Sequence, residues 1–423
     1  MNYAQHVVAD RAQALGQQLT LPCGAALVNR LAKAALTEGL ADAQNRATVR
    51  HQRLYRRWAE GGAGLSITGN VQIDRRFLER PGNIVIDEKA DLAALAELAE
   101  AGKRPGAHFW MQINHPGRQT PAHVHPRPLA PSAIPLGLPG FGEPQAMSEA
   151  EINDVIGRFA FVAGAAKRAG FTGVQIHAAH GYLLSQFLSP LSNVREDDWG
   201  GSLRNRARLL LEVIASVRVE VGADFPIGVK LNSADFQKGG FSEDECVQVV
   251  KWLEESGVDL LEVSGGTYEK PVMVTAARVA VAESTLRREA YFLDYAKTLR
   301  AETKMPLMVT GGFRSLDAMS EALRSGNVDV IGLGRPLIMC PEGPRELLSG
   351  EREALPAPET TLQLNPEDSE KFLSMKGWGI QSWFCVQLLR LGDGLDPDDS
   401  MSVAQALALY RQNERDAVES LQR

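Results

Sequence analysis

Short apolar segments alternate with longer amphipathic segments along most of the chain. The apolar segments have the length of buried strands. The predicted strands are Leu31–Leu36, Gly64–Val71, Ala107–Ile113, Gly173–Ile176, Ile227–Leu231, Leu260–Val263, Leu307–Val309 and Val330–Leu333. This alternation is typical of a parallel sheet covered by helices, and eight strands are the number that a closed barrel needs.

Helical periodicity fills the stretches between these strands. The predicted helices are Asn45–Glu60, Ala90–Ala101, Glu149–Ala169, Leu203–Val221, Glu243–Ser256, Tyr291–Glu302 and Leu316–Arg324. Ser148 with Glu151, and Ser242 with Glu245, have the spacing of capping boxes. A doubly wound open sheet is the competing fold, but its glycine-rich fingerprint near the first strand is missing. The sequence therefore predicts an α/β protein with a (β/α)8 TIM barrel.

Two of the predicted loops are unusually long. His115–Met147 follows the third strand, and Gly265–Ala290 follows the sixth. Loops longer than about 12–15 residues inside a compact domain are usually functional. Both loops lie at the C-terminal ends of strands, where barrel enzymes build their active sites.

The chain from about Glu351 onward forms no further strand–helix unit. Trp378, Trp383 and the run Phe384–Leu391 make it too apolar to be simply disordered. We therefore expect residues 1–350 to form the barrel. Residues 351–423 are expected to form a C-terminal extension that packs on the barrel or on a partner subunit of a homo-oligomer.

Charge and composition argue against several classes of partner. The formal net charge is −7 and no Lys/Arg block stands out, whereas nucleic acids and anionic membranes need a basic face. No apolar run approaches the ~20 residues of a membrane span. The cysteines, at positions 23, 246, 340 and 385, are too scattered for a disulfide framework, a zinc site or an iron–sulfur ligand run. The N-terminus lacks the pattern of a signal peptide, so we expect a cytoplasmic protein.

His177, His180 and Tyr182 follow the fourth predicted strand, where side chains reach the mouth of a barrel. Two histidines facing one carbonyl or nitro oxygen can donate hydrogen bonds that strengthen as negative charge develops. Tyr182 can donate a proton to a carbanionic carbon. The alternative is a His–Tyr cluster that only satisfies its own hydrogen bonds. A metal site is disfavoured because no carboxylate or cysteine completes a ligand set.

Glycine-containing segments follow the last two predicted strands. They are Gly311-Gly312-Phe313 after strand seven and Gly334-Arg335 after strand eight. These are the loops with which barrels bind phosphate through backbone N–H groups. Taken alone, they indicate only a phosphate-binding barrel, a feature that aldolases and isomerases share.

The segments His177–Pro190 and Asn193–Arg206 resemble the signature of the old yellow enzyme family. The wider resemblance covers about Gly24 to Pro341 and leaves the C-terminal extension outside. It implies an FMN-binding barrel with His177 and His180 as oxygen binders and Tyr182 as proton donor. The cysteines do not form the iron–sulfur motif of the multidomain branch, so we expect the stand-alone type.

The resemblance also implies positions along the flavin. Ala35, Leu36 and Thr37 correspond to the segment beside the isoalloxazine, with the Thr37 hydroxyl near flavin O4. As an alternative, a threonine after a strand is also a common helix N-cap. Asn70 corresponds to a position behind the flavin that is usually filled by a small residue.

Gln112 and Lys230 complete the flavin site that the resemblance implies. Gln112 matches a glutamine that binds the pyrimidine edge. Lys230 matches a position that is often arginine, where a cation stabilises the N1/C2=O region of reduced flavin. Lysine supplies the charge but not the planar fork of arginine.

The leading hypothesis is an ene-reductase that uses FMN and NADH or NADPH. The nicotinamide reduces FMN at N5, and the flavin then passes hydride to the C=C bond of an activated alkene, such as an enone or nitroalkene, or to a quinone. Two alternatives stay open. One is a non-redox flavin-dependent double-bond isomerase, and the other is a flavin-free, phosphate-binding lyase.

Overall fold

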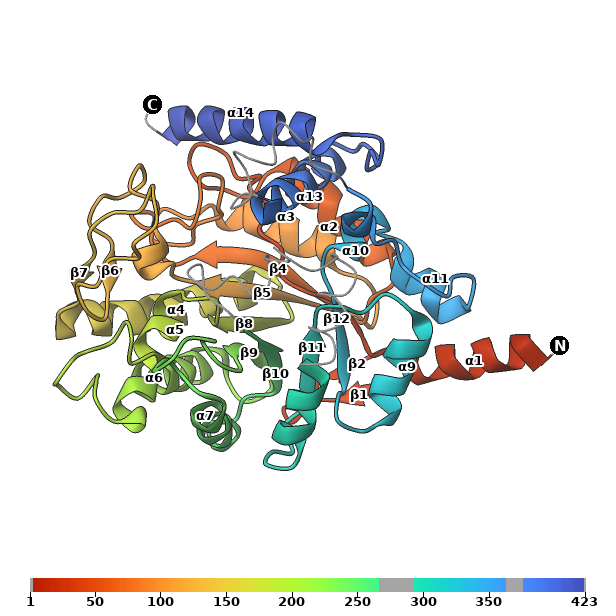
Figure 1. The fold of residues 1–423 in the computed structure, drawn as a ribbon, viewed down its shortest axis with the longest axis horizontal. Coiled ribbons are helices and arrows are strands. Elements are labelled where there is room, and N and C mark those ends of the chain that lie inside the picture. The colour runs from red at the N-terminus through yellow and green to blue at the C-terminus, as the bar shows by residue number, and fades with distance from the viewer. Residues whose placement is uncertain (1–2, 266–291, 363–375, 422–423) are drawn as a thin grey trace.

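The computed structural model of the protein describes residues 3–265, 292–362 and 376–421 (Figure 1). Its centre is a closed barrel of parallel strands in the order β10-β11-β12-β3-β4-β5-β8-β9. The strands are β3 Leu31–Lys33, β4 Leu65–Gln72, β5 His108–Asn114, β8 Gly173–Ala178, β9 Ile227–Asn232, β10 Leu260–Ser264, β11 Leu307–Thr310 and β12 Val330–Leu333. The predicted (β/α)8 barrel is confirmed, with all of its predicted strands present.

The first barrel strand is shorter than the sequence indicated. β3 ends at Lys33, although the apolar run continues to Leu36. The neighbouring strand β12 ends at Leu333, which is the register partner of Lys33. Because the hydrogen-bonding partner ends there, the chain leaves the sheet and Ala35 is free to face the barrel mouth. Most of the other strands extend one or two residues beyond their predicted C-terminal ends.

The predicted helices surround the barrel. They are α2 Val49–Glu60, α3 Leu92–Gly102, α4 Glu149–Ala169, α6 Leu203–Val221, α7 Glu243–Glu255, residues 292–300, and α9 Leu316–Arg324. The expected start of α2 at Asn45 is wrong, because Asn45 has a φ of 59° and Thr48 is extended as the N-cap. The capping boxes of α4 and α7 are confirmed.

Several further elements lie outside the predicted pattern. They are α1 Tyr3–Leu15, β1 Leu19–Thr20, β2 Ala26–Leu27, η1 Gly117–Gln119, β6 Leu129–Ala130, β7 Gln145–Ala146, α5 Leu183–Leu188, α10 Pro336–Met339, α11 Gly343–Ser349, η2 Pro358–Thr360, α13 Lys376–Gly392 and α14 Val403–Leu421. The first predicted long loop thus carries a parallel pair, β6 with β7. The second, Gly265–Ala290, lies outside the described residues except for Gly265.

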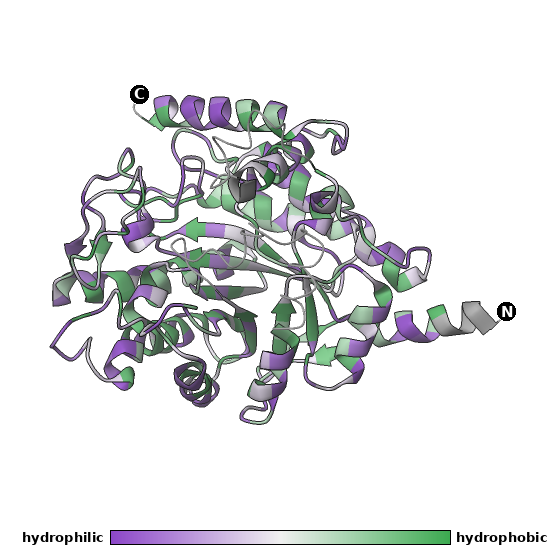
Figure 2. Ribbon diagram, in the orientation of Figure 1, coloured by the Kyte–Doolittle hydropathy of each residue, from purple (hydrophilic) through white to green (hydrophobic). Residues whose placement is uncertain are grey.

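Alternation along the strands separates two apolar clusters. The outward side chains join the layer between the sheet and the helices, and the barrel strands are accordingly hydrophobic in Figure 2. The inward side chains near the amino ends form a second cluster that includes Trp110, Leu260 and Met308. Two residues further along each strand, on the same face, stand Gln112, Glu262 and Thr310. The barrel interior therefore changes from apolar to polar toward its carboxyl end.

The C-terminal extension covers part of this barrel. Helix α13 packs against α2 and α10, and α14 packs against α13 (Figure 1). Trp383 in α13 donates from Nε1 to the carbonyl of Met401 at 2.8 Å. Arg80, which follows β4, forms an ion pair with Glu414 of α14. Of the helices that the structure describes, none has the length and hydrophobicity needed to cross a membrane.

Lys33 is an unusual component of the layer between β3 and α2. Its side chain is fully buried, and Nζ donates to the carbonyl of Ile67 at 2.7 Å. The same ammonium lies 4.3 Å from the ring centroid of Trp58 and 4.9 Å from that of Tyr55. Burial lowers the pKa of Lys33 from 10.5 to about 7, against the opposing effect of Glu38. Charging this lysine therefore opposes folding.

We predict that Lys33 makes the free energy of unfolding depend on pH. The unfolded chain binds the Lys33 proton up to about pH 10.5 and the folded chain only up to about pH 7, so stability rises with pH between these values. Lys33→Met should lack this rise, which we expect to be on the order of 1–2 kcal/mol over two pH units. Urea unfolding of both proteins across this range measures the difference. Lys89→Met, at an exposed position, should keep the wild-type slope. Parallel curves for wild type and Lys33→Met would contradict the prediction.

Candidate active site

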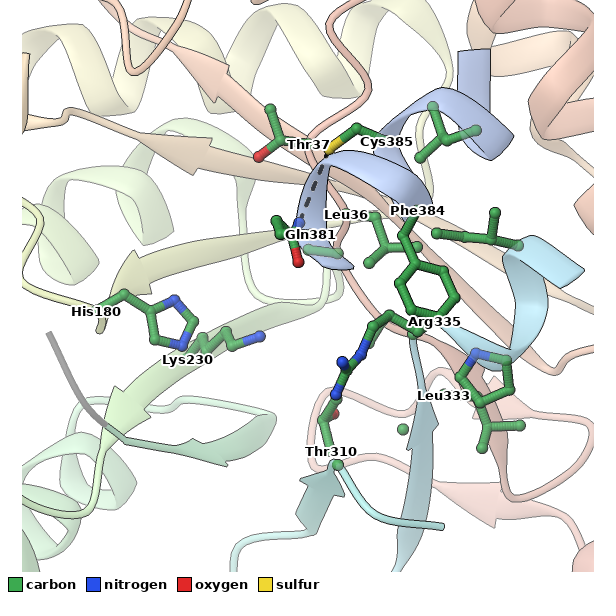
Figure 3. A pocket seen from close by; sticks show the side chains of 18 of the residues that line it. Leu36, Thr37, His180, Lys230, Thr310, Leu333, Arg335, Gln381, Phe384 and Cys385 are labelled. Atoms are coloured by element: carbon green, nitrogen blue, oxygen red, sulfur yellow. Dashed lines mark hydrogen bonds between the residues drawn. The ribbon is translucent and has the colours of Figure 1, made fainter. Parts of the chain in front are cut away.

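A cavity of about 310 Å³ lies at the carboxyl end of the barrel (Figure 3). Most of the residues predicted to bind flavin or to act on substrate line it. They are Ala35, Leu36, Thr37, His180, Tyr182, Lys230, Gly311, Gly312, Phe313, Gly334 and Arg335. Three predicted residues, Asn70, Gln112 and His177, are buried and do not belong to the lining. The structure therefore brings together segments from five different strand ends.

His177 and His180 are bonded to each other. His177 lies on β8, and its Nε2 is 3.0 Å from Nδ1 of His180. His180 follows the strand with a φ of 62°, and its Nε2 is 2.7 Å from Oγ of Ser264. Its backbone N–H donates to Oδ1 of Asn232 at 3.1 Å. This arrangement differs from the prediction that both histidines face one substrate oxygen, because their facing nitrogens already have protein partners.

Electrostatics keep these two rings neutral. Burial is the main cause that lowers the pKa of both histidines well below the usual value, and the charge of Lys230 lowers it further. A neutral imidazole has one donor and one acceptor nitrogen. Presenting two N–H groups to one substrate oxygen therefore requires His177 and His180 to leave their present bonds. Nδ1 of His177 has no hydrogen-bond partner within the described residues.

Tyr182 forms part of the cavity wall beside the histidines. It is the residue before α5, and the turn from Ala179 is closed by a hydrogen bond of 3.2 Å from the N–H of Tyr182. Its ring centroid lies 4.8 Å from that of His177 and 6.5 Å from that of His180. The tight turn and the helix start thus fix the phenol at the mouth of the barrel.

Thr37 and Asn70 interact directly. The Thr37 hydroxyl donates to Oδ1 of Asn70 at 2.8 Å. Asn70 follows an irregularity in β4, where the register with β5 shifts between Ile67 and Asn70. The prediction placed the Thr37 hydroxyl at flavin O4, whereas here the hydroxyl is directed to Asn70. Irregular strand positions of this kind re-aim side chains next to active sites.

Lys230 enters the cavity from β9 and is paired with an acid that sequence reasoning missed. Its Nζ lies 2.9 Å from Oε1 of Glu262 on β10, and both side chains are buried. Figure 3 shows Lys230 next to His180 in the cavity. Glu262 stands two residues after Leu260, and the other residues of the predicted strand Leu260–Val263 are apolar. An acid at an inward position of a buried strand is the sequence signal that could have identified it.

The part of the cavity wall that follows β11 and β12 has the features of a phosphate site. Gly311 and Gly312 have φ values of 124° and 86°, and a Cβ on Gly311 would meet no atom within 4 Å. Thr310 Oγ1 is buried without a hydrogen-bond partner in the described part of the chain. Arg335 adds a guanidinium to the same wall. Backbone N–H groups, an unsatisfied hydroxyl and a cation fit the phosphate of FMN.

The C-terminal extension supplies one wall of the cavity. Its lining residues are Gln381, Phe384, Cys385 and Leu388 of α13 and Tyr410 of α14. The guanidinium carbon of Arg335 lies 5.5 Å from the ring centroid of Phe384, which places it against the aromatic face (Figure 3). The apolar run in the sequence indicated that this segment packs, but it did not indicate which side chains meet the cavity.

No cluster of three or more histidine, cysteine or acidic side chains suited to a metal ion occurs among the residues that the structure describes. The side chains described above suit an organic cofactor with a phosphate group and a substrate with a polarisable oxygen.

Comparisons with known proteins agree with this geometry. The sequence model of the NADH:flavin oxidoreductase / NADH oxidase family matches residues 23–353. A similar relative is the NADH-dependent flavin oxidoreductase iliE of Neonectria sp. (strain DH2), which is 39% identical over 355 residues, 78% of this chain and 46% of that protein. This chain thus spans about half the length of that relative.

Two solved structures share the fold. A complex of 2-naphthoyl-CoA reductase with 2-naphthoyl-CoA superposes with a TM-score of 0.75 at 28% identity, covering 80% of this chain and 52% of that one. The old yellow enzyme homologue from Zymomonas mobilis superposes with a TM-score of 0.68 at 25% identity, covering 84% of this chain and 97% of that one.

We predict that Arg335→Met weakens the binding of FMN but not of riboflavin, which lacks the phosphate. Hydrogen bonds to charged groups contribute about 1.5–3 kcal/mol, so the Kd for FMN should rise roughly 10- to 150-fold. Quenching of flavin fluorescence on binding measures both constants. Arg324→Met, at a partly exposed arginine outside the cavity lining, serves as the control. Equal losses for the two flavins would remove Arg335 from the phosphate site.

Proposed function

The chain belongs to the NADH:flavin oxidoreductase / NADH oxidase family, which confirms the resemblance to old yellow enzymes, and on this premise we propose that it is an ene-reductase. Its cofactor is FMN, and its reductant is NADH or NADPH. The proposed acceptor is the C=C bond of an activated alkene, or a quinone. The observation that carries the proposal is the meeting of Tyr182 and His180 with Lys230 and Arg335 in one cavity.

The residues around the cavity suit both the phosphate and the ring system of FMN. When bound, FMN supplies the transfer of hydride between the nicotinamide and the acceptor. The loop at Gly311 and Gly312, the hydroxyl of Thr310 and the guanidinium of Arg335 would hold its phosphate. Lys230 would offer a cation to the part of the ring system that becomes negative on reduction.

The histidines and Tyr182 act on the acceptor. His180 lines the cavity and binds a carbonyl or nitro oxygen, together with His177 once the two rings separate. Hydrogen bonds to that oxygen strengthen as charge develops on it. Tyr182 then donates its phenolic proton to the α-carbon. Because the histidines bind an oxygen and Tyr182 protonates a carbon, the substrate must be an alkene conjugated to a carbonyl or nitro group.

Two similarities support this choice of substrate and reductant. The 2-naphthoyl-CoA reductase was solved with 2-naphthoyl-CoA, whose unsaturated ring is conjugated to a thioester carbonyl. The Neonectria relative is named an NADH-dependent flavin oxidoreductase. NADH is therefore the first reductant to test, with a simple enone as acceptor.

Net consumption of NADH tests the reaction itself. We expect one NADH to be oxidised for each saturated product formed from an enone under anaerobic conditions, measured by absorbance and by chromatography of the product. Rearranged alkene without net NADH oxidation would contradict the proposal and would identify a double-bond isomerase instead.

We predict that Tyr182→Phe separates the two half-reactions. Reduction of the flavin by NADH needs no proton from Tyr182, so its rate should change little. Reduction of an enone needs a proton on carbon, and general acid catalysis is typically worth roughly 10²–10⁴-fold. Stopped-flow spectroscopy follows both steps, and enone turnover should fall within that range.

Quinones are the control substrates for this variant, because their reduced forms are oxyanions that need no immediate proton on carbon. Hydride transfer to a quinone should therefore survive in Tyr182→Phe. Equal losses with enone and quinone would mean that Tyr182 shapes the cavity and is not the proton donor.

A further inference from the structure

A chain of buried polar side chains runs through the barrel interior below the cavity. Glu262 on β10, which is 0% exposed, accepts a hydrogen bond of 2.8 Å from Nε2 of Gln175 on β8. Gln175 in turn accepts a hydrogen bond of 2.8 Å at Oε1 from Nε2 of Gln112 on β5. The other carboxylate oxygen of Glu262 lies 2.9 Å from Nζ of Lys230. One acid thus connects two residues predicted to contact the flavin.

The direction of this chain follows from the chemistry of its groups. An ionised carboxylate only accepts hydrogen bonds, so the amide end of Gln175 that meets Glu262 must be its NH₂ group. The carbonyl end of Gln175 is then left to meet Gln112, and Gln112 must donate from its own NH₂ group. This leaves Oε1 of Gln112 as an acceptor. The amide orientation of both glutamines is therefore determined by Glu262.

The register of the strands makes these contacts possible. Gln112 is the direct partner of Gln175 in the β5–β8 ladder, and Lys230 is the direct partner of Glu262 in the β9–β10 ladder. All of these residues are at most 4% exposed. Water therefore does not compete for the hydrogen bonds, and an unpaired member would be costly.

We propose that Glu262 is a positioning residue for the flavin: it directs the Gln112 amide through Gln175 and balances the charge of Lys230. The inference rests on the proposed function, because it assigns these residues to the FMN site. Lys230 lines the cavity and Glu262 does not, so the ion pair presents its positive end to the cofactor. The negative charge of Glu262 limits how much the positive charge of Lys230 stabilises the negative, reduced flavin.

The first test is the midpoint potential of bound FMN in Glu262→Gln. The substitution keeps the size of the side chain and removes its charge, so Lys230 loses its counter-ion and the potential should rise. The control is Asp259→Asn. Asp259 directly precedes the amino end of β10 and is a buried acid paired with Arg218 outside the cavity, so this substitution should leave the potential unchanged. An unchanged or lower potential in Glu262→Gln would overturn the charge-balancing role.

A double-mutant comparison separates charge balance from a general structural effect. In a Lys230→Met background, the buried Glu262 carboxyl has no counter-ion and takes up a proton. Glu262→Gln then removes no charge and should no longer raise the potential. A rise of the same size in both backgrounds would overturn the proposed link between the two residues.

The second test addresses the amide orientation. Gln175→Leu cuts the chain between Glu262 and Gln112 but keeps the pair with Lys230, so the Kd for FMN should rise roughly tenfold, the effect of one lost hydrogen bond. Its potential should shift less than that of Glu262→Gln. An unchanged Kd would overturn the orienting role. This test does not depend on the folding of the Glu262→Gln variant.

These outcomes are distinct from failure of the proposed function. A wild-type protein that binds no FMN, or whose flavin NADH does not reduce, contradicts the function itself. If the wild-type protein binds FMN and NADH reduces it, but the variants keep the wild-type potential and affinity, only the role of Glu262 is contradicted.

Discussion

Closure of the barrel is the constraint on which the rest of the structure depends. The ladder between β12 and β3 pairs Ile331 with Leu31 and Leu333 with Lys33, and it joins the last strand to the first. A closed sheet leaves no edge, so every inward side chain must pack or find a partner inside. Near the amino ends the strands meet this demand with apolar residues. Toward the carboxyl ends they meet it with an ion pair and amide hydrogen bonds, and of these groups Lys230 reaches the cavity wall.

The sequence predicted the strands well because buried parallel strands are continuous apolar runs. It predicted the end of the first strand poorly, since Leu36 is as apolar as its predecessors and only the length of β12 ends the ladder. The residues around the cavity were mostly identified from their motif and from their position after strands. Their contacts were not, because the bond of His180 to Ser264 and that of Thr37 to Asn70 join positions far apart in sequence.

The C-terminal extension distinguishes this chain from the core that it shares with its family. The matched region ends at residue 353, yet Phe384 and Tyr410 lie beyond it and line the cavity. Phe384 packs on the guanidinium of Arg335, and Arg80 pairs with Glu414 next to the same wall. The extension therefore contributes to the cofactor end of the cavity through residues that the family pattern does not contain. An apolar run in a tail predicts packing, but the packing partner depends on the folded barrel.

The central claim is that one cavity holds FMN and passes electrons from a nicotinamide to an alkene. An anaerobic spectral titration of the purified protein tests it most directly. The account predicts a visible flavin spectrum that NADH bleaches, and that one equivalent of an enone then restores. A protein that stays colourless after addition of FMN would contradict the account, and so would a bleached flavin that neither an enone nor a quinone reoxidises.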